Sequence, residues 1–239
     1  VIVIHGESIQ SFAMDLSFNG KEVTPTINKL AKEGIYFNNF YAVESVGTSS
    51  DTEFTFNSSL MPSSTGTVFM SYYDRNYITI PKLLKQNGYT TFSMHGNTCD
   101  FWNREQTHMN FGYDNFYCYT KSYKIDETIG LGLSDKSFFR QSIPIIKENS
   151  NNKFYSVLIM LSNHTPFSDI KNHSDYDISY TYIDSNNKKY CIDNCKNKEL
   201  FFQKDNQECK TSCPYYYDPV NNECLDTCLK TTNLEYANP

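Results

Sequence analysis

Three short apolar runs dominate the pattern of hydrophobic and polar positions in the first part of the chain. They are VIVI at 1–4, TTFSM at 90–94 and FYSVLIML at 154–161. None of them alternates cleanly between apolar and polar residues, which is typical of parallel strands that are buried on both faces. The pattern therefore predicts three central strands of a parallel sheet.

Helical patterns separate these runs. A Thr-Pro pair at 24–25 starts the first helix and Gly34 ends it, because a threonine cap, a proline in the first turn and a terminal glycine suit helix ends. Pro81 starts a second helix, which Gly88 ends, and a third spans 134–148. In the last two helices, the residues expected to face the core are Leu83, Leu84, Phe138, Phe139, Ile143 and Ile146.

The alternation of strands and helices predicts an α/β fold with a mostly parallel sheet sandwiched by helices. Each apolar run ends near a residue capable of metal or anion chemistry: Glu7, His95 and His164. The carboxyl ends of parallel strands meet at one edge of a sheet, where such folds bind their ligands. We therefore expect these three side chains to gather at that edge.

The apolar rhythm fades from about residue 172, and the rest of the chain is rich in cysteine. We predict a first domain at 1–184 and a cysteine-rich extracellular module at 185–239. The module's six cysteines fall in pairs separated by three residues, and it contains no histidine. This favours a disulfide-stapled module over a zinc ribbon, with the pairing left open. The cysteines are Cys191, Cys195, Cys209, Cys213, Cys224 and Cys228.

Charge and length limit the partners. The 239 residues carry a formal net charge of −6, which argues against nucleic acid because phosphate backbones favour basic surfaces. No apolar run approaches the roughly 18 residues of a membrane span. The chain opens directly on a strand-like run, so we expect a fragment whose membrane anchor lies upstream.

The stretch SVGTSSDTEF at 45–54 has two interpretations. The first is a capping box, in which the Ser50 hydroxyl and the Glu53 carboxylate bind the free N–H groups at a helix start. The second places Ser49 just before a helix N-terminus, where the free N–H groups favour an anion. A serine hydroxyl becomes a good nucleophile when a base or a metal activates it, and Glu7 is a suitable metal ligand.

Six motifs in order resemble one family. They are HGES (5–8), GKEVTPTINKLAKEGIYFNNFY (20–41), GTSSDTEF (47–54), HGNTCDFWNR (95–104), IGLGLSDKSFF (129–139) and SNHTPF (162–167). Together they resemble the extracellular catalytic domain of lipoteichoic acid synthases, which are phosphoglycerol transferases of the sulfatase and alkaline phosphatase superfamily. The resemblance covers roughly residues 1–168.

The resemblance implies roles for individual residues. Glu7 matches a metal ligand, and Ser49 matches the nucleophile that also binds the metal, with Thr48 as an alternative one residue away. The residues that match the glycerol-phosphate pocket are His95, Trp102, Arg104 and His164. The implied metal is divalent, Mn²⁺ in the first place and Mg²⁺ or Zn²⁺ otherwise. The implied partners are an anionic glycerophospholipid and a glycerol-phosphate polymer at the cell surface, outside the cytoplasm.

The residue types suit that chemistry. Arg104 can hold a phosphate in bidentate fashion, and Trp102 offers a flat wall for the glycerol. The implied reaction has two steps. A phosphatidylglycerol-like donor gives its glycerol phosphate to Ser49, and a polymer hydroxyl then takes it.

Two alternatives remain open. The family completes its metal site with a downstream Asp-His pair, whereas His173 is the one histidine that follows His164. We therefore expect an incomplete metal site, which leaves room for a non-catalytic surface protein that binds glycerol-phosphate polymers. A sulfatase that matures its nucleophile to formylglycine would need x-Pro-x-Arg after that residue, and 49–53 reads SSDTE.

Overall fold

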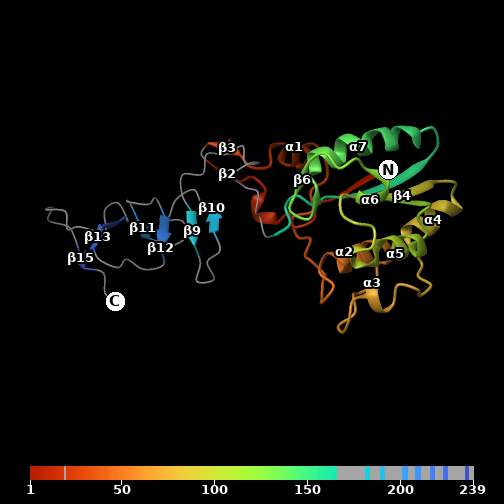
Figure 1. Ribbon diagram of the computed structural model, residues 1–239, viewed down its shortest axis with the longest axis horizontal. Coiled ribbons are helices and arrows are strands. Elements are labelled where there is room, and N and C mark those ends of the chain that lie inside the picture. The colour runs from red at the N-terminus through yellow and green to blue at the C-terminus, as the bar shows by residue number, and fades with distance from the viewer. Residues whose placement is uncertain are drawn as a thin grey trace. The chain divides into compact units, whose positions relative to one another are not determined.

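The structure is a computed structural model that describes residues 1–165 apart from residue 19, and beyond them the backbone of short strands between 181 and 236. The chain forms two compact units (Figure 1). The first comprises 1–11 and 30–172, and the second 12–29 and 173–239. The predicted domains, 1–184 and 185–239, remain a prediction.

The first unit is built on a four-stranded sheet with the order β1-β8-β4-β5. Its strands are β1 (Ile2–His5), β4 (Thr90–His95), β5 (Asn115–Cys118) and β8 (Phe154–Ile159). All three pairings are parallel, which confirms the predicted α/β sheet. In the register, His5 and His95 both pair with Ile159, so the carboxyl ends of three strands are level.

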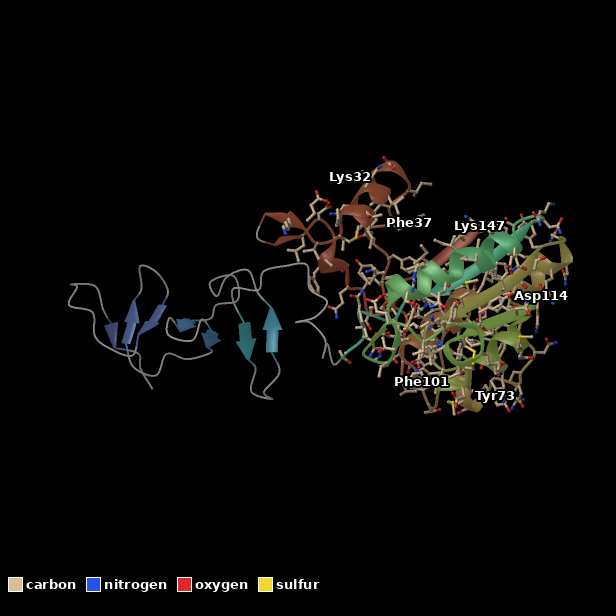
Figure 2. The ribbon with its side chains drawn as sticks, turned by 45° about the horizontal axis from the view of Figure 1, so that its top comes forward. Lys32, Phe37, Tyr73, Phe101, Asp114 and Lys147 are labelled. Atoms are coloured by element: carbon tan, nitrogen blue, oxygen red, sulfur yellow. A yellow bond between two sulfur atoms is a disulfide. The ribbon has the colours of Figure 1, made fainter. Side chains whose placement is uncertain are left out.

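Helices cover both faces of this sheet (Figure 1). One face carries α2 (Ser49–Ser58), α3 (Val68–Ser71), α4 (Ile80–Gln86) and α5 (Arg104–Phe111), and the other carries α7 (Asp135–Glu148). Figure 2 shows the same layering with side chains, with Lys147 of α7 on one side and Phe101 and Tyr73 on the other. Smaller elements are η2 (Phe101–Asn103), α6 (Tyr119–Ser122), β6 (Thr128–Ile129) and β7 (Gly132–Leu133).

Each face of the sheet has its own core. Phe92 and Met94 of β4 pack with Phe138 of α7, whereas Val157 and Ile159 of β8 belong to the cluster that faces α2 and α5. Successive residues of a strand point to opposite faces. Ser93 and His95 of β4 are therefore directed to the α2 and α5 side, and this places polar groups inside that layer.

Three burial predictions were wrong. Leu83 is 48% exposed and Ile143 is 49% exposed, because neighbouring helix positions are about 100° apart and Leu84, Ile145 and Ile146 take the packed side instead. The first strand is not buried on both faces either. β1 is an edge strand of its sheet, so Ile2 and Ile4 are 51% and 57% exposed.

The helix predicted at 25–34 is confirmed as α1 (Pro25–Glu33), and the Gly34 amide bonds the Leu30 carbonyl at its end. The division between the two units falls within α1 and within η1 (Ser11–Ala13), and the second unit also holds a hairpin of β2 (Ser17–Phe18) and β3 (Lys21–Glu22). Within it, the Thr24 hydroxyl donates to the Ala13 carbonyl.

The remainder of the second unit is a seven-stranded sheet with the order β10-β9-β12-β11-β14-β13-β15. Its strands are β9 (Thr181–Ile183), β10 (Lys189–Cys191), β11 (Phe201–Gln203), β12 (Glu208–Lys210), β13 (Tyr216–Asp218), β14 (Glu223–Leu225) and β15 (Glu235–Tyr236). The chemistry predicted for the six tail cysteines concerns side chains outside those that the structure describes. The same holds for His173.

Candidate active site

The strand ends deliver Glu7, His95 and His164 to the carboxyl edge of the sheet, as the sequence predicts. Glu7 follows β1 by two residues, His95 is the last residue of β4, and His164 lies in the loop after β8. Because the three strands are parallel and level, these residues lie at one edge. His164 is half-buried, and its Nδ1 donates to the Thr165 carbonyl at 2.7 Å.

Glu7 presents a buried oxygen with an unsatisfied charge. The residue is 4% exposed, and its Oε2 has no hydrogen-bond partner. The nearest cation is the guanidinium of Arg104, whose Nη2 lies 3.9 Å from this oxygen and 2.9 Å from Glu53 Oε1. Buried carboxylate oxygens are normally paired or bound to metal. The unmatched oxygen of Glu7 therefore fits a ligand of a divalent cation.

The loop before α2 is tightly constrained. Oδ2 of Asp51 accepts from the amides of Ser45 and Gly47, both at 2.9 Å. A Cβ at Gly47 would lie 2.3 Å from Asp51 Oδ1, so only glycine fits there. Thr48 follows with φ 45° and ψ −115°, a conformation that non-glycine residues rarely adopt. Backbone strain of this kind is concentrated at functional sites.

The capping-box interpretation of this stretch is wrong. Helix α2 begins at Ser49, so Ser50 is already inside it. The Ser50 hydroxyl is buried and donates to the Gly47 carbonyl at 2.7 Å, with the Thr67 hydroxyl at 3.1 Å. Glu53 bonds other side chains instead of the helix start. Among the three hydroxyls at 48–50, Ser50 is thus committed to the scaffold, while Ser49 is half-buried and Thr48 exposed.

Glu53 forms a buried ion pair with Arg104. Its Oε1 lies 2.9 Å from Nε and 2.9 Å from Nη2 of the guanidinium, and both residues are buried. Ser49 is four residues before Glu53 on α2, so the two share a helix face. This relationship places the predicted nucleophile on the side of α2 that faces Arg104.

His108 is a functional candidate that the sequence prediction missed. Its Nε2 donates to Glu53 Oε2 at 2.9 Å, because a carboxylate can only accept, and its Nδ1 lies 2.7 Å from the Ser93 hydroxyl. Arg104 and His108 are spaced i, i+4 on α5, and Ser93 and His95 are spaced i, i+2 on β4. These two spacings are visible in the sequence and were the signal for a shared buried network.

His95 is enclosed rather than open to solvent. Its Nδ1 donates to the Ile159 carbonyl at 3.1 Å, and its Nε2 accepts from Arg104 Nη1 at 3.1 Å. Burial, with the Arg104 charge beside it, lowers the pKa of His95 to about 3. The imidazole is therefore neutral at physiological pH, and both of its nitrogens are engaged.

The charge of Glu53 is held by its partners. Burial alone would raise the pKa of Glu53, but the Arg104 charge and the hydrogen bond from His108 outweigh it, and the pKa lies well below its usual value. Glu53 is thus a carboxylate across the physiological pH range. The buried network then contains one permanent cation and two acidic residues, Glu53 and Glu7, of which only Glu53 is directly paired.

Trp102 lies in a strained loop between β4 and α5. Trp102 and Asn103 have φ of 57° and 53°, which is a rare conformation for a bulky side chain. The Asn103 side chain donates to the Phe69 carbonyl at 3.1 Å, and the half-buried indole packs against the core on the α2 side. The strain and the partial exposure are consistent with a substrate-facing position for Trp102.

One disulfide and two backbone hydrogen bonds hold this loop. A disulfide joins Cys99 to Cys118 at the end of β5. The Leu133 amide donates to the Gly96 carbonyl at 2.9 Å, and the Tyr119 amide donates to the Asn97 carbonyl at 2.9 Å. These contacts fix the β4 end of the loop, and the hydrogen bond from Asn103 to the Phe69 carbonyl holds the end that leads into Arg104.

Asp135 fixes the loop after β8 in the same way. Its carboxylate accepts from the amides of Leu161 at 2.7 Å and Ser162 at 3.2 Å, and its own amide donates to the Ser162 hydroxyl. Burial raises the pKa of Asp135, and those two amide bonds oppose the shift. The loop that carries His164 is thus anchored to the start of α7.

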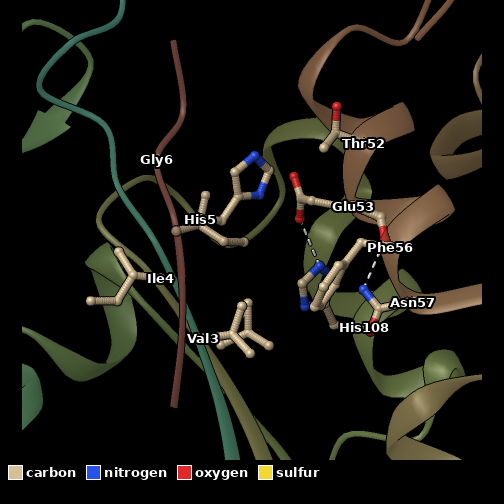
Figure 3. A pocket seen from close by; sticks show the side chains of 11 residues that line it. Val3, Ile4, His5, Gly6, Thr52, Glu53, Phe56, Asn57 and His108 are labelled. Atoms are coloured by element: carbon tan, nitrogen blue, oxygen red, sulfur yellow. Dashed lines mark hydrogen bonds and ion pairs between the residues drawn. The ribbon is translucent and has the colours of Figure 1, made fainter. Parts of the chain in front are cut away.

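A cavity of about 200 Å³ lies between β1 and α2 beside this network (Figure 3). The picture shows His5 of β1 facing Thr52 and Glu53 of α2, with His108 below Glu53 and joined to it by a hydrogen bond. Apolar side chains supply much of the remaining lining, including Val3, Phe56, Val157 and Ile159. The cavity is large enough for a small molecule, and Glu53 and His108 form part of its wall.

Comparison with known proteins decides the family. The sulfatase family model matches residues 1–229. The chain belongs to the sulfatase family. It is 41% identical over 172 residues to lipoteichoic acid synthase 1 of Bacillus subtilis, which covers 70% of this chain and 27% of that protein. It is also 41% identical over 172 residues to lipoteichoic acid synthase of Staphylococcus aureus, covering 70% and 26%.

Solved structures of the sulfatase relatives agree. The lipoteichoic acid synthase LtaP from Listeria monocytogenes matches with a TM-score of 0.69 at 32% identity, over 74% of this chain and 44% of that chain. The Streptococcus pyogenes phosphoglycerol transferase GacH, solved with sn-glycerol-1-phosphate, shares the fold with a TM-score of 0.55 at 19% identity, over 74% and 50%. The predicted resemblance to lipoteichoic acid synthases is confirmed.

The match is partial in length. This sulfatase-family chain spans about a quarter of the curated relatives that it matches. Among the residues that the structure describes, no cluster of three or more His, Cys, Asp or Glu side chains is placed to bind a metal ion. No helix in the described part of the chain is long and apolar enough to span a membrane.

Proposed function

We propose that this sulfatase-family chain transfers glycerol phosphate from a phosphatidylglycerol-like lipid to a hydroxyl of a cell-surface polymer. The observation that carries the proposal is the buried Glu7 Oε2, which has no hydrogen-bond partner and lies 3.9 Å from Nη2 of Arg104. The carboxylate oxygen suits a cation, and the neighbouring guanidinium suits a phosphoryl oxygen. The similarity to lipoteichoic acid synthases supports the same chemistry.

Glu7 and Ser49 are the residues that would hold a divalent cation, Mn²⁺ in the first place. A hard cation prefers carboxylate and hydroxyl oxygens, and the unmatched Oε2 of Glu7 meets that preference. When bound, such a cation would lower the pKa of the serine hydroxyl and neutralise negative charge on the phosphoryl oxygens.

Ser49 would act as the nucleophile in two displacements at phosphorus. In the first, its Oγ bonds to phosphorus, the bond from phosphorus to the diacylglycerol oxygen breaks, and that oxygen takes up a proton as Ser49 loses one. In the second, the polymer hydroxyl bonds to phosphorus, the Oγ–phosphorus bond breaks, and Ser49 regains a proton from the attacking hydroxyl. Splitting one transfer into two steps in this way is typical of covalent catalysis.

The pocket residues would divide the remaining work. Arg104 would bind a phosphoryl oxygen through its guanidinium, which His95 holds by accepting a hydrogen bond from Nη1. Trp102 forms a wall for the glycerol, and His164 donates to or accepts from its hydroxyls. We do not expect His95 to contact the substrate directly, because both of its ring nitrogens already bind protein groups.

We propose a location outside the cytoplasm, with a membrane anchor in a part of the protein beyond this chain. The Cys99–Cys118 disulfide supports that location, because disulfides persist in oxidising compartments.

The test is release of diacylglycerol from acyl-labelled phosphatidylglycerol, with Mn²⁺ present or removed by chelation. The proposal predicts metal-dependent release that S49A and E7Q both abolish. The variant E105Q is the matched control, because Glu105 pairs with Lys121 on the exposed surface and should be dispensable. Formylglycine at position 49 would favour a sulfatase. Binding of glycerol phosphate without release at any Mn²⁺ concentration would favour a non-catalytic binding protein.

A further inference from the structure

Glu53 of α2 contacts both Arg104 and His108 of α5 in the buried layer. We propose that Glu53 is a positioning residue that holds Arg104 away from Glu7, so that the Glu7 carboxylate stays free for a cation and Arg104 stays oriented for phosphate. This inference rests on the proposed function. It assigns to Glu53 and His108 a role that neither the sequence motifs nor the relatives' names supply.

Two hydrogen bonds connect α5 to β4, and the Glu53 carboxylate connects the two α5 residues that form them. The first contact is Arg104 Nη1 to His95 Nε2 at 3.1 Å, and the second is His108 Nδ1 to the Ser93 hydroxyl at 2.7 Å. Glu53 joins them from α2, with Oε1 on Arg104 and Oε2 on His108, each at 2.9 Å. Each carboxylate oxygen therefore has a defined partner.

Arg104 has two carboxylates within reach and is bonded to one of them. Glu53 lies at 2.9 Å, whereas Glu7 Oε2 lies 3.9 Å from the same Nη2, beyond hydrogen-bond distance. A buried guanidinium that lost Glu53 would be left uncompensated, which is costly. Its nearest remaining carboxylate would be that of Glu7. The movement of about 1 Å that closes this gap would occupy the proposed metal ligand and turn the guanidinium from phosphate.

His108 sets the orientation of Glu53. Its ring is packed against Phe69, Phe111, Tyr113 and Phe116, so its position is fixed by apolar contacts. From that fixed position, Nε2–H holds Oε2 of Glu53 and leaves Oε1 facing Arg104. His108 thus acts on Arg104 through Glu53.

The principal experiment compares E53Q with wild type in diacylglycerol release and in Mn²⁺ affinity measured by electron paramagnetic resonance of free Mn²⁺. We expect E53Q to lower kcat/KM and to weaken Mn²⁺ binding, each on the order of 10- to 100-fold. Variant E105Q, which removes an exposed carboxylate one position after Arg104, should leave both within about twofold. If E53Q changes thermal stability but leaves both quantities within twofold of wild type, the proposal is overturned.

A double-mutant cycle separates positioning from a general structural effect. If Glu53 acts through Arg104, E53Q should cause no further loss of Mn²⁺ affinity or kcat/KM in an R104Q background. Equal losses in both backgrounds would contradict the proposal.

Two further variants keep the inference testable if E53Q fails to fold. In H108Q the amide can still donate to Glu53, whereas H108F fills the aromatic cage without a donor. We expect H108Q to bind Mn²⁺ as wild type does and H108F to bind about tenfold more weakly. Equal affinities in the two variants would refute the role of His108 and Glu53. A wild type that releases no diacylglycerol would refute the proposed function instead, and the Mn²⁺ comparison would still decide the positioning role.

Discussion

Glu53 and Arg104 form an ion pair closed to solvent, with Oε1 of the carboxylate 2.9 Å from both Nε and Nη2 of the guanidinium. The pair joins α2, which begins with the predicted nucleophile, to α5, which begins with Arg104 itself. The stability of the site and the orientation of its cation therefore depend on the same contact.

Removal of the carboxylate should be costly to stability. We expect E53A to lower the free energy of unfolding by about 3–5 kcal/mol, because it leaves the Arg104 charge buried without its partner. Urea denaturation monitored by circular dichroism measures this change. The exposed pair of Glu105 and Lys121 is the comparison, and E105A should cost no more than about 1 kcal/mol. Equal losses from the two variants would contradict the account.

Acid should destabilise the fold well above the pH at which carboxylates titrate. The folded-state pKa of His95 is lowered from 6.5 to about 3, so between these values the unfolded chain binds a proton that the folded chain does not. Stability is therefore present above pH 6.5 and is lost as the pH falls, by up to about 1.4 kcal/mol per pH unit. Urea midpoints at pH 7, 6 and 5 measure this slope, and H95Q should flatten it.

Glu53 extends the same trend at lower pH. Its folded-state pKa lies below the ordinary value of 4.5, so its contribution is complete above pH 4.5 and is lost as the pH falls further. E53Q should remove this second part of the acid sensitivity while the slope between pH 6.5 and 4.5 persists. A pH-independent midpoint from 7 to 5 in wild type would refute the assignment to His95, and equal slopes of wild type and E53Q below pH 4.5 would refute the assignment to Glu53.

The disulfide between Cys99 and Cys118 should stabilise the loop that carries Trp102 and Arg104. The two cysteines are 19 residues apart in sequence, and a loop of that size corresponds to about 3 kcal/mol of unfolded-state entropy. We expect C99S/C118S to lose about that much stability. Peptide mapping without reduction should recover residues 99 and 118 on linked peptides, and free thiols at both positions would disprove the bond.

Gly47 should tolerate no side chain. A Cβ there would lie 2.3 Å from Asp51 Oδ1 and 2.8 Å from the Ser50 hydroxyl. We expect G47A to displace Asp51, to cost about 1–3 kcal/mol of stability and to lower transfer, because the loop before Ser49 loses its anchor. Unfolding and diacylglycerol release measure the two effects. Gly34, at the end of α1, is the control glycine, and G34A should leave transfer unchanged.

The sequence predicts the sheet and the strand-end residues well, because apolar runs and helix caps are local signals. Strands at 2–5, 90–95 and 154–159 lie within one or two residues of the predicted runs. The exposure of Ile2 and Ile4 was not predictable from the run itself, since it depends on which strand forms the edge. Edge position is a property of the whole sheet.

The site was only partly predictable for the same reason. Motif resemblance suggested Glu7, Ser49 and Arg104 as site residues, and local spacing suggested a capping role for Glu53. That role failed because a tertiary partner, Arg104, lies 51 residues away and binds the carboxylate more strongly than a helix terminus does. His108 was missed because its spacing from Arg104 shows that the two share a helix face, but not which residues of other elements that face contacts. The roles of Glu7 and Ser49 in metal binding and catalysis stay predictions, as do those of Trp102, Arg104 and His164 in binding substrate.

Peptide mapping by mass spectrometry tests the central claim most directly. The protein would be mixed with phosphatidylglycerol and Mn²⁺ without a polymer acceptor, quenched in acid and digested. We predict one glycerophosphoryl group on Ser49, absent from S49A and retained in T48A. The same group on Thr48, or no adduct while diacylglycerol is released, would contradict the account.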